Sequence, residues 1–236
     1  MLDVHAPHTS THTLRDFLIH IATISVGLLI AIGLEQGVEA IHRHHERDQL
    51  RAALNRESQQ ILYDSTRADE NLTTGLEYLK LVERTLSEAI RTHQTFVLPP
   101  PPSSQGSSYD LPNEPVLKAA KSTGTLALLT DDEVIAYGEM DLIMEHVSIE
   151  FAAEGLAENK AAVRVHEIQI DEKPESNSFA RATPEQLRQL DSDLVVLENS
   201  RSSLLTKIHS AQGAATAMLA GERDLRKIQM AERKNK

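Results

Sequence analysis

Histidines gather at the start of the chain. Seven of the eleven lie within the first 45 residues, namely His5, His8, His12, His20, His42, His44 and His45. Imidazole changes charge near neutral pH and binds transition metals. This clustering makes metal binding and proton sensing the two kinds of chemistry to weigh first.

The last three of these histidines alternate with acids at helical spacing. Glu35, Glu39, His42 and Glu46 would follow one face of a helix, with His45 close to His42. Nitrogen and carboxylate ligands one turn apart can hold Zn²⁺, which makes Glu39, His42, His45 and Glu46 a speculative metal-ligand set. One helix supplies two or three ligands, so a complete site needs others from elsewhere. We favour a polar collar at the lipid headgroups, with metal binding and proton sensing as alternatives.

The composition excludes several classes of function. The chain has no cysteine, which rules out disulfides, thiolate nucleophiles and cysteine-ligated metal centres. Its net charge of −11 speaks against a nucleic-acid partner, because phosphate contacts need clustered Lys and Arg. Sequence patterns for phosphate loops, zinc proteases, serine hydrolases and EF-hands are missing. We therefore expect no catalytic residue, no cofactor and no enzymatic activity, and the alternative is an enzyme whose residues are scattered along the chain.

The most informative segment runs uncharged from Phe17 to Leu34. Its sequence, FLIHIATISVGLLIAIGL, would span about 27 Å as a helix, close to the hydrocarbon thickness of a bilayer. A cleaved signal peptide would have a basic start and a shorter apolar core, and a soluble core helix would have a polar stripe. We predict a single transmembrane helix over residues 17–34, and both alternatives stay open.

Small residues line one face of this predicted span. Thr23, Gly27 and Ala31 are four residues apart, a spacing that lets helix backbones approach closely in lipid. They form a candidate oligomerisation stripe, although Gly and Ala are also common in spans for no such reason.

The orientation of the span stays open. Four arginines follow it and one precedes it, which favours a cytoplasmic C-terminal part. They are Arg43, Arg47, Arg51 and Arg56 after the span, and Arg15 before it. The four lie on a stretch that also carries acids, which weakens this count.

Four motifs stand close together at the start of the chain: V-H-A-P-H, R-D-F, I-S-V-G-L-L-I-A-I-G-L-E-Q-G-V-E and H-R-H-H. They resemble a family of uncharacterised bacterial proteins that have an H-x-P-H leader and one G-L-L-I-A-x-G-L-E membrane span. The chain is similar, more loosely, to a second group with an I-G-I-L-I-A-type span and a basic leader. The first resemblance implies a bacterial membrane anchor, and neither group is linked to an activity. The second implies a C-terminal part outside the cytoplasm.

Composition changes divide the chain into five segments. They are a polar His-containing leader (1–16), the span (17–34), juxtamembrane and amphipathic helices (35–97), a Pro/Ser-rich linker or loop (98–115) and a helical bundle segment (116–236). The third segment could be one rod or could bend near Gly75. In the fourth, four consecutive prolines favour an extended rod.

Helix starts are marked in the last segment. Asn113 could cap a short helix that Gly124 closes, and Thr130 with Glu133 has the form of a capping box. The stretch Thr183–Gln186 begins the last helix with a cap and a first-turn proline.

The last helix has an apolar seam from Leu187 to Met218 that Arg201 interrupts. We expect Arg201 to keep its charge in water at an edge, and the alternative is a buried carboxylate partner that fixes register. The acid pairs Asp131/Asp132 and Asp191/Asp193 are interpreted as helix-start and solvated residues.

The sequence therefore predicts an all-α protein in which one N-terminal transmembrane helix continues into an antiparallel bundle or coiled coil. We expect a single-pass protein of the bacterial inner (cytoplasmic) membrane that presents a helical interaction or signal-receiving module. Its expected partners are the lipid bilayer and a second copy or another protein, bound through helices. The alternative function is metal or proton sensing by the juxtamembrane histidines.

Overall fold

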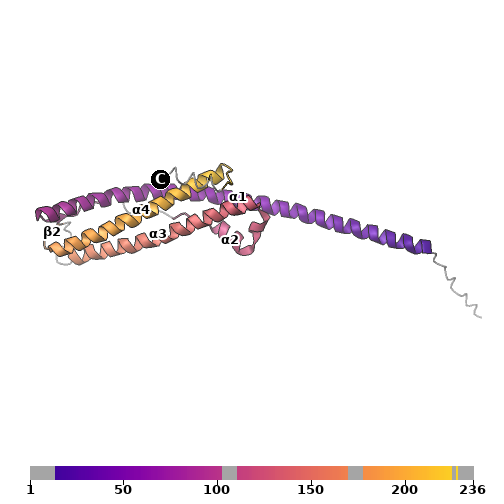
Figure 1. The fold of residues 1–236 in the computed structure, drawn as a ribbon, viewed down its shortest axis with the longest axis horizontal. Helices are drawn as coiled ribbons and strands as arrows, with labels where there is room; N and C mark the ends of the chain where they lie inside the picture. The colour runs from indigo at the N-terminus through magenta and orange to yellow at the C-terminus, as the bar shows by residue number, and fades with distance from the viewer. Residues whose placement is uncertain (1–13, 103–110, 170–177, 225–226, 228–236) are drawn as a thin grey trace, which may run out of the picture. The chain divides into compact units, whose positions relative to one another are not determined.

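The computed structural model describes residues 14–102, 111–169, 178–224 and 227. Within these ranges the chain is all-α apart from one pair of two-residue strands, which confirms the predicted fold class (Figure 1). The elements are α1 (Leu14–Thr92), β1 (Phe96–Val97), α2 (Pro115–Thr123), the 3₁₀ helix η1 (Thr125–Leu128), α3 (Asp131–Gln169), β2 (Ser178–Phe179) and α4 (Pro184–Leu219). Most of the predicted leader and the centre of the Pro/Ser-rich segment lie outside the described residues.

The chain divides into two compact units at residue 50. The first contains the apolar part of α1, and the second contains the remainder of α1 and all other elements. Helix α1 continues through Gly75, so the region that could have been one rod or two helices is helical without a break up to Thr92.

The second unit is a bundle of three long helices (Figure 1). Helices α1 and α3 run in the same direction, because Arg51 of α1 pairs with Glu133 at the start of α3, and Gly75 further along α1 lies against the Arg201 that pairs with Glu154 further along α3. Helix α4 runs antiparallel to α1, since Asp69 of α1 contacts His209 late in α4 and Ser87 contacts Asp191 early in it. Helices α3 and α4 follow each other in sequence and pack along their lengths.

Aliphatic side chains spaced three and four residues apart hold the three helices together. Each helix contributes one buried stripe of such residues. In α1 the heptad spacing of Leu72, Leu79 and Leu86 predicts this stripe. The other stripes include Met140, Met144 and Val147 in α3 and Leu190, Leu194, Leu197, Leu204 and Ile208 in α4. Burying one such side chain stabilises the fold by about 2 kcal/mol.

The segment between α1 and α3 returns along α1. The hydroxyl of Tyr78 donates to the carbonyl of Pro99 at 2.9 Å, and further along the backbone amides of Val116 and Leu117 donate to the carboxylate of Glu57 at 2.5 and 3.1 Å. A return of this kind is required because α1 and α3 are parallel.

Glu57 also explains an error in the predicted cap of α2. The N-cap is Glu114 rather than Asn113, and Glu114 makes no side-chain capping bond. The buried carboxylate of Glu57 reaches across from α1 and takes the two first-turn amides in place of a local cap. At the other end Gly124 closes α2 with φ 75°, as predicted.

The capping boxes of α3 and α4 are confirmed. Thr130 and Glu133 exchange side-chain-to-backbone hydrogen bonds at the start of α3. Thr183 and Gln186 do the same at the start of α4, with Pro184 in the first turn.

A small clasp closes the end of the bundle where α1 stops. Strands β1 and β2 pair antiparallel, with Phe96 opposite Phe179. The two rings are almost fully buried and stack with their centroids 5.1 Å apart. Two-residue strands leave no alternating pattern in a sequence, so this clasp was not predicted.

Arg201 is buried in the middle of the bundle, which corrects the prediction that it keeps its charge in water. Its side chain is 10% exposed, and its Nε and Nη2 donate to Oε1 of Glu154 in α3 at 2.8 and 2.5 Å. Gly75 of α1 makes the room, since a Cβ there would lie 2.8 Å from Nη1 of Arg201. The expected alternative, a buried carboxylate partner, is what the structure contains.

We predict that Gly75→Ala lowers the free energy of unfolding by about 1–3 kcal/mol, because the added methyl group must displace an ion-paired guanidinium. Gly138→Ala in α3 is the matched control, since its Cβ would meet nothing within 4 Å. The control should stabilise by about 0.5–1 kcal/mol through helix propensity. Chemical denaturation measures both, and an equal gain in the two variants would contradict the tight fit around Gly75.

Candidate functional site

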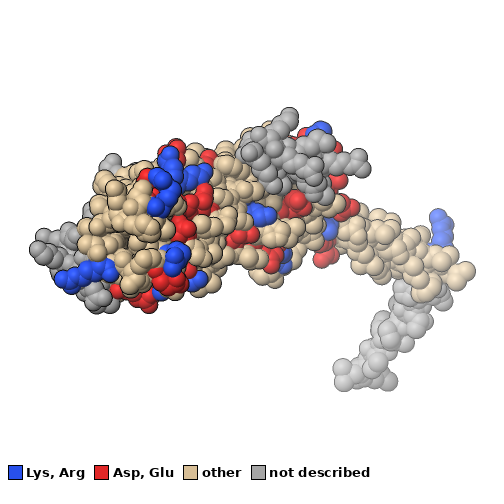
Figure 2. All heavy atoms as spheres, turned by 60° about the vertical axis from the view of Figure 1, so that its left-hand side comes forward, with Lys and Arg blue, Asp and Glu red and all other residues tan. Residues whose placement is uncertain are grey.

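The apolar part of α1 is exposed throughout. Every residue from 14 to 45 is exposed, and the exposed fraction of the large apolar residues in 17–34 ranges from 41% at Ile32 to 70% at Ile24. The helix is long and apolar enough to cross a membrane, and no residue of its most apolar stretch is buried. Figure 2 shows this part of the chain with few charged side chains on the face drawn, whereas red and blue side chains cover much of the bundle.

The predicted oligomerisation stripe is open on this helix. The hydroxyl of Thr23 donates to the carbonyl of Ile19 at 2.9 Å, so its polarity is satisfied within the helix. A Cβ on Gly27 would meet nothing within 4 Å, and Ala31 is exposed. This face can therefore accept the backbone of another helix.

The histidines that follow the apolar segment each contact a different neighbour one turn ahead. His42 Nε2 lies 3.0 Å from a carboxylate oxygen of Glu46, and His44 Nε2 lies 3.4 Å from one of Asp48. His45 contacts the side-chain amide of Gln49 at 2.8 Å. All three are exposed, which suits a polar collar at the end of the apolar segment.

The speculative metal-ligand set does not come together as a group. His42 and Glu46 are in contact, but Glu39 faces Arg43 at 3.9 Å and His45 faces Gln49. Among the described residues, no three His, Asp or Glu side chains are arranged to hold a metal ion. His20 is exposed on the apolar segment, and His5, His8 and His12 lie outside the described residues.

Two carboxyl groups meet between α1 and α4. Glu83 lies against Glu198, with Asp191 and Lys80 nearby. Oε1 of Glu83 is shielded from solvent and has no hydrogen-bond partner within the part of the chain that the structure describes. Burial, and then the negative charge of Glu198, raise the pKa of Glu83 to about 7. This pair can hold or release one proton near neutral pH.

Other carboxylates in the bundle are held in their charged form by partners. Arg51 donates twice to Glu133 at 2.8 Å, and this pairing lowers the pKa of Glu133 to about 2. Asp193 is only 4% exposed and contacts Lys160 and Arg164. Its interpretation as a solvated residue is therefore wrong, because its partners lie on α3. Asp131 and Asp132 are exposed in the first turn of α3, as expected.

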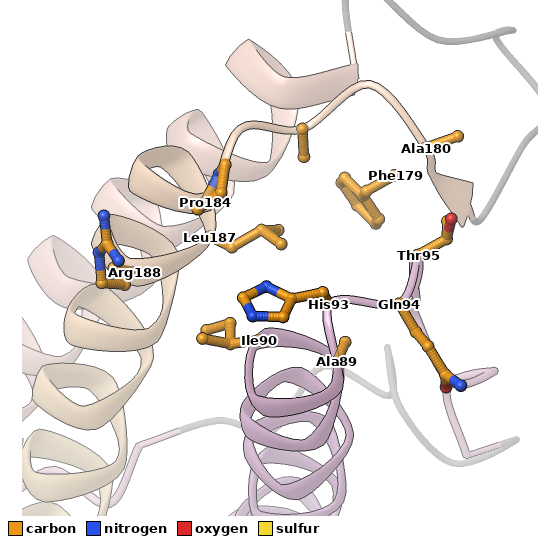
Figure 3. Close-up of a pocket in the computed structure, with 11 residues that line it drawn as sticks. Ala89, Ile90, His93, Gln94, Thr95, Phe179, Ala180, Pro184, Leu187 and Arg188 are labelled. Carbon is orange, nitrogen blue, oxygen red and sulfur yellow. The ribbon is translucent and has the colours of Figure 1, made fainter.

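A pocket of about 210 Å³ lies beside the clasp. His93, Ile90 and Leu187 line it, with Arg188 at one side (Figure 3). Among the residues that the structure describes, His93 is the one non-glycine residue with a positive φ, 54°. It follows the last residue of α1, and the amide of Gln94 donates to the carbonyl of Ala89. This geometry is the usual helix ending that favours glycine. Sequence analysis missed His93 because a lone histidine carries no sign of its backbone angle.

Comparison of the chain with protein-family models found no matching family, and searches of curated proteins and of solved structures found no match either.

We predict that the bundle loses stability as pH rises from about 4.5 to 7, because the folded state raises the pKa of Glu83 and so binds this proton more tightly than the unfolded chain. Glu83→Gln mimics the protonated group, so it should leave stability unchanged at pH 4.5 and raise it at pH 8. We expect about 1 kcal/mol, since partial exposure of Glu83 screens the interaction. Denaturant melts at both pH values measure it.

The exposed Glu77→Gln in α1 is the control for this prediction. An equal gain in both variants at pH 8 would trace the effect to net charge rather than to the contact with Glu198.

We predict that His93→Gly stabilises the protein by about 1 kcal/mol, because glycine adopts the left-handed conformation without a Cβ penalty. His93→Ala removes the same imidazole and keeps the Cβ, so it should give no such gain. Thermal melts of the two variants separate backbone strain from side-chain effects. Matching melting temperatures would show that the strain at this position is negligible.

Proposed function

We propose that the protein is a single-pass protein of the bacterial inner membrane that holds a helical interaction or signal-receiving module at the bilayer and catalyses no reaction. One observation carries this proposal. The exposed apolar segment and the first helix of the bundle belong to the same helix, α1, with no loop between them. Lipid would cover an apolar surface that nothing else in the described chain covers.

The chemistry of the bundle supports a module that binds rather than catalyses. Its buried charges pair with oppositely charged residues on other helices, as in Arg201 with Glu154 and Asp193 with Lys160. Cross-helix pairs of this kind suit groups that set helix register.

The face of Thr23, Gly27 and Ala31 supports self-association within the membrane, because small residues let spans pack closely in lipid. A sensor built on the juxtamembrane histidines has less support, since His42, His44 and His45 each face a different side chain.

We predict that the full chain, expressed in a bacterium, stays in the membrane pellet after an alkaline carbonate wash with its N-terminus intact. Leu29→Arg combined with Ile30→Arg should move most of it to the supernatant, because each arginine at the centre of a span costs roughly 3 kcal/mol. Fractionation, immunoblotting and intact mass measure this. A reporter fused to each terminus then assigns the side of the bundle.

Val195→Arg combined with Val196→Arg is the matched control, since these residues are exposed aliphatics on α4. Release of the unsubstituted chain by carbonate, or its recovery without residues 1–33, would refute the anchor.

A further inference from the structure

The pocket of about 210 Å³ beside the clasp has walls from three parts of the chain (Figure 3). They are the end of α1, the clasp with the residues that follow it, and the first turns of α4. The wall residues Ala89, Phe179 and Leu187 are each at most 7% exposed and belong to the core of the bundle. The core behind them therefore holds the pocket in a preformed shape.

The pocket has room for a molecule that contains one ring. A cavity of about 150 Å³ lined by Leu, Ile and Phe side chains can hold one benzene molecule. This pocket is larger, and Ile90, Phe179 and Leu187 give it an apolar lining of the same kind. The additional volume leaves space for a polar group attached to the ring.

Two exposed side chains with nitrogen donors, His93 and Arg188, complete the lining. The imidazole of His93 points from the end of α1 toward α4, where Arg188 lies (Figure 3). Within the part of the chain that the structure describes, His93 makes no hydrogen bond or ion pair. Arg188 uses Nη2 in an exposed pair with Glu185 at 3.0 Å, which contributes little, and its guanidinium has further N–H donors. These two side chains therefore suit a carboxylate.

The backbone of His93 supplies an independent argument. Its φ of 54° lies in the left-handed region, where glycine would end the helix without a Cβ penalty. Backbone of this kind gathers at ligand-binding and active sites. It distinguishes His93 from the other exposed histidines of the described chain, whose backbones are helical.

We propose that this pocket binds a small monocarboxylate with an aromatic or branched aliphatic body. The carboxylate lies between His93 and Arg188, and the hydrocarbon part lies against Ile90, Phe179 and Leu187. Such a ligand contacts α1, the clasp and α4 together, so it stabilises this end of the bundle.

This ligand class rests on the proposed function in one respect, because it gives the signal-receiving module a signal to receive. The binding itself does not depend on the membrane anchor, since all the residues that line the pocket belong to the bundle unit.

Ligand-observed NMR with the full chain in lipid nanodiscs tests the proposal, with benzoate as the probe and empty nanodiscs as the blank. Benzoate should bind and should raise the melting temperature of the bundle. Benzyl alcohol lacks the carboxylate and acetate lacks the ring, so each should bind roughly ten-fold more weakly or worse. Benzoate binding no stronger than to empty nanodiscs, or an equal affinity for benzyl alcohol or acetate, would overturn the proposal.

Two variants test the two parts of the pocket. His93→Gly removes the imidazole and should weaken benzoate binding about ten-fold, although this variant should be the more stable protein. Ala182→Leu fills the pocket and should weaken binding by a similar factor while His93 stays in place. His146→Ala, which removes an exposed histidine of α3, is the matched control and should bind as the unsubstituted chain does. Unchanged affinity in either His93→Gly or Ala182→Leu would overturn the proposal.

The same titration separates a failure of this site from a failure of the anchor. If carbonate releases the chain from membranes, the full chain is titrated with benzoate in buffer without nanodiscs. Binding there would leave the pocket standing without the anchor, and an anchored chain that binds no benzoate would overturn the pocket alone.

Discussion

The bundle depends on one buried ion pair, Arg201 with Glu154. A guanidinium removed from water costs several kcal/mol unless a carboxylate takes its hydrogen bonds, so these two groups must meet for the helices to pack. Gly75 completes the arrangement by leaving out a side chain where the guanidinium lies against α1. Arg201 of α4, Glu154 of α3 and Gly75 of α1 therefore align the three helices at one level, whereas aliphatic stripes alone would pack nearly as well after a shift of one turn.

Contacts between segments far apart in the sequence also hold the two ends of the bundle together. At one end, Glu57 of α1 takes the first amides of α2, so the returning segment is attached to α1. At the other end, Phe96 and Phe179 stack between two short strands. Polar, ionic and aromatic contacts at these places therefore supplement the aliphatic core, in a chain with only 3% aromatic residues.

Local signals in the sequence predicted much of the fold. The capping boxes at Thr130 and Thr183 and the helix-ending Gly124 are confirmed because their chemistry involves neighbours within a few residues. The errors concern partners far apart in the chain. Asn113 was expected to cap α2, but the cap comes from Glu57, and Arg201 and Asp193 were expected in water, but their partners lie on α3. The apolar periodicity of α4 does not specify which residue of α3 lies opposite a given residue of α4.

The candidate site was also predictable only in part. The composition of residues 17–34 predicted a segment that the bundle does not bury, and the structure shows it exposed. Which side chain each histidine contacts, and the meeting of Glu83 with Glu198, depend on side-chain directions and helix register that spacing alone does not determine.

The contacts of Arg201 and Glu57 limit how the bundle could transmit a signal. A piston stroke of α1 by one turn, about 5.4 Å, would replace Gly75 with a residue that has a side chain beside the guanidinium of Arg201, and it would pull Glu57 off the amides of α2. The first change crowds a buried ion pair, and the second leaves a buried carboxylate without its hydrogen bonds. A stimulus that acts on this bundle must therefore rotate or separate the helices, or change which molecules bind to their surface.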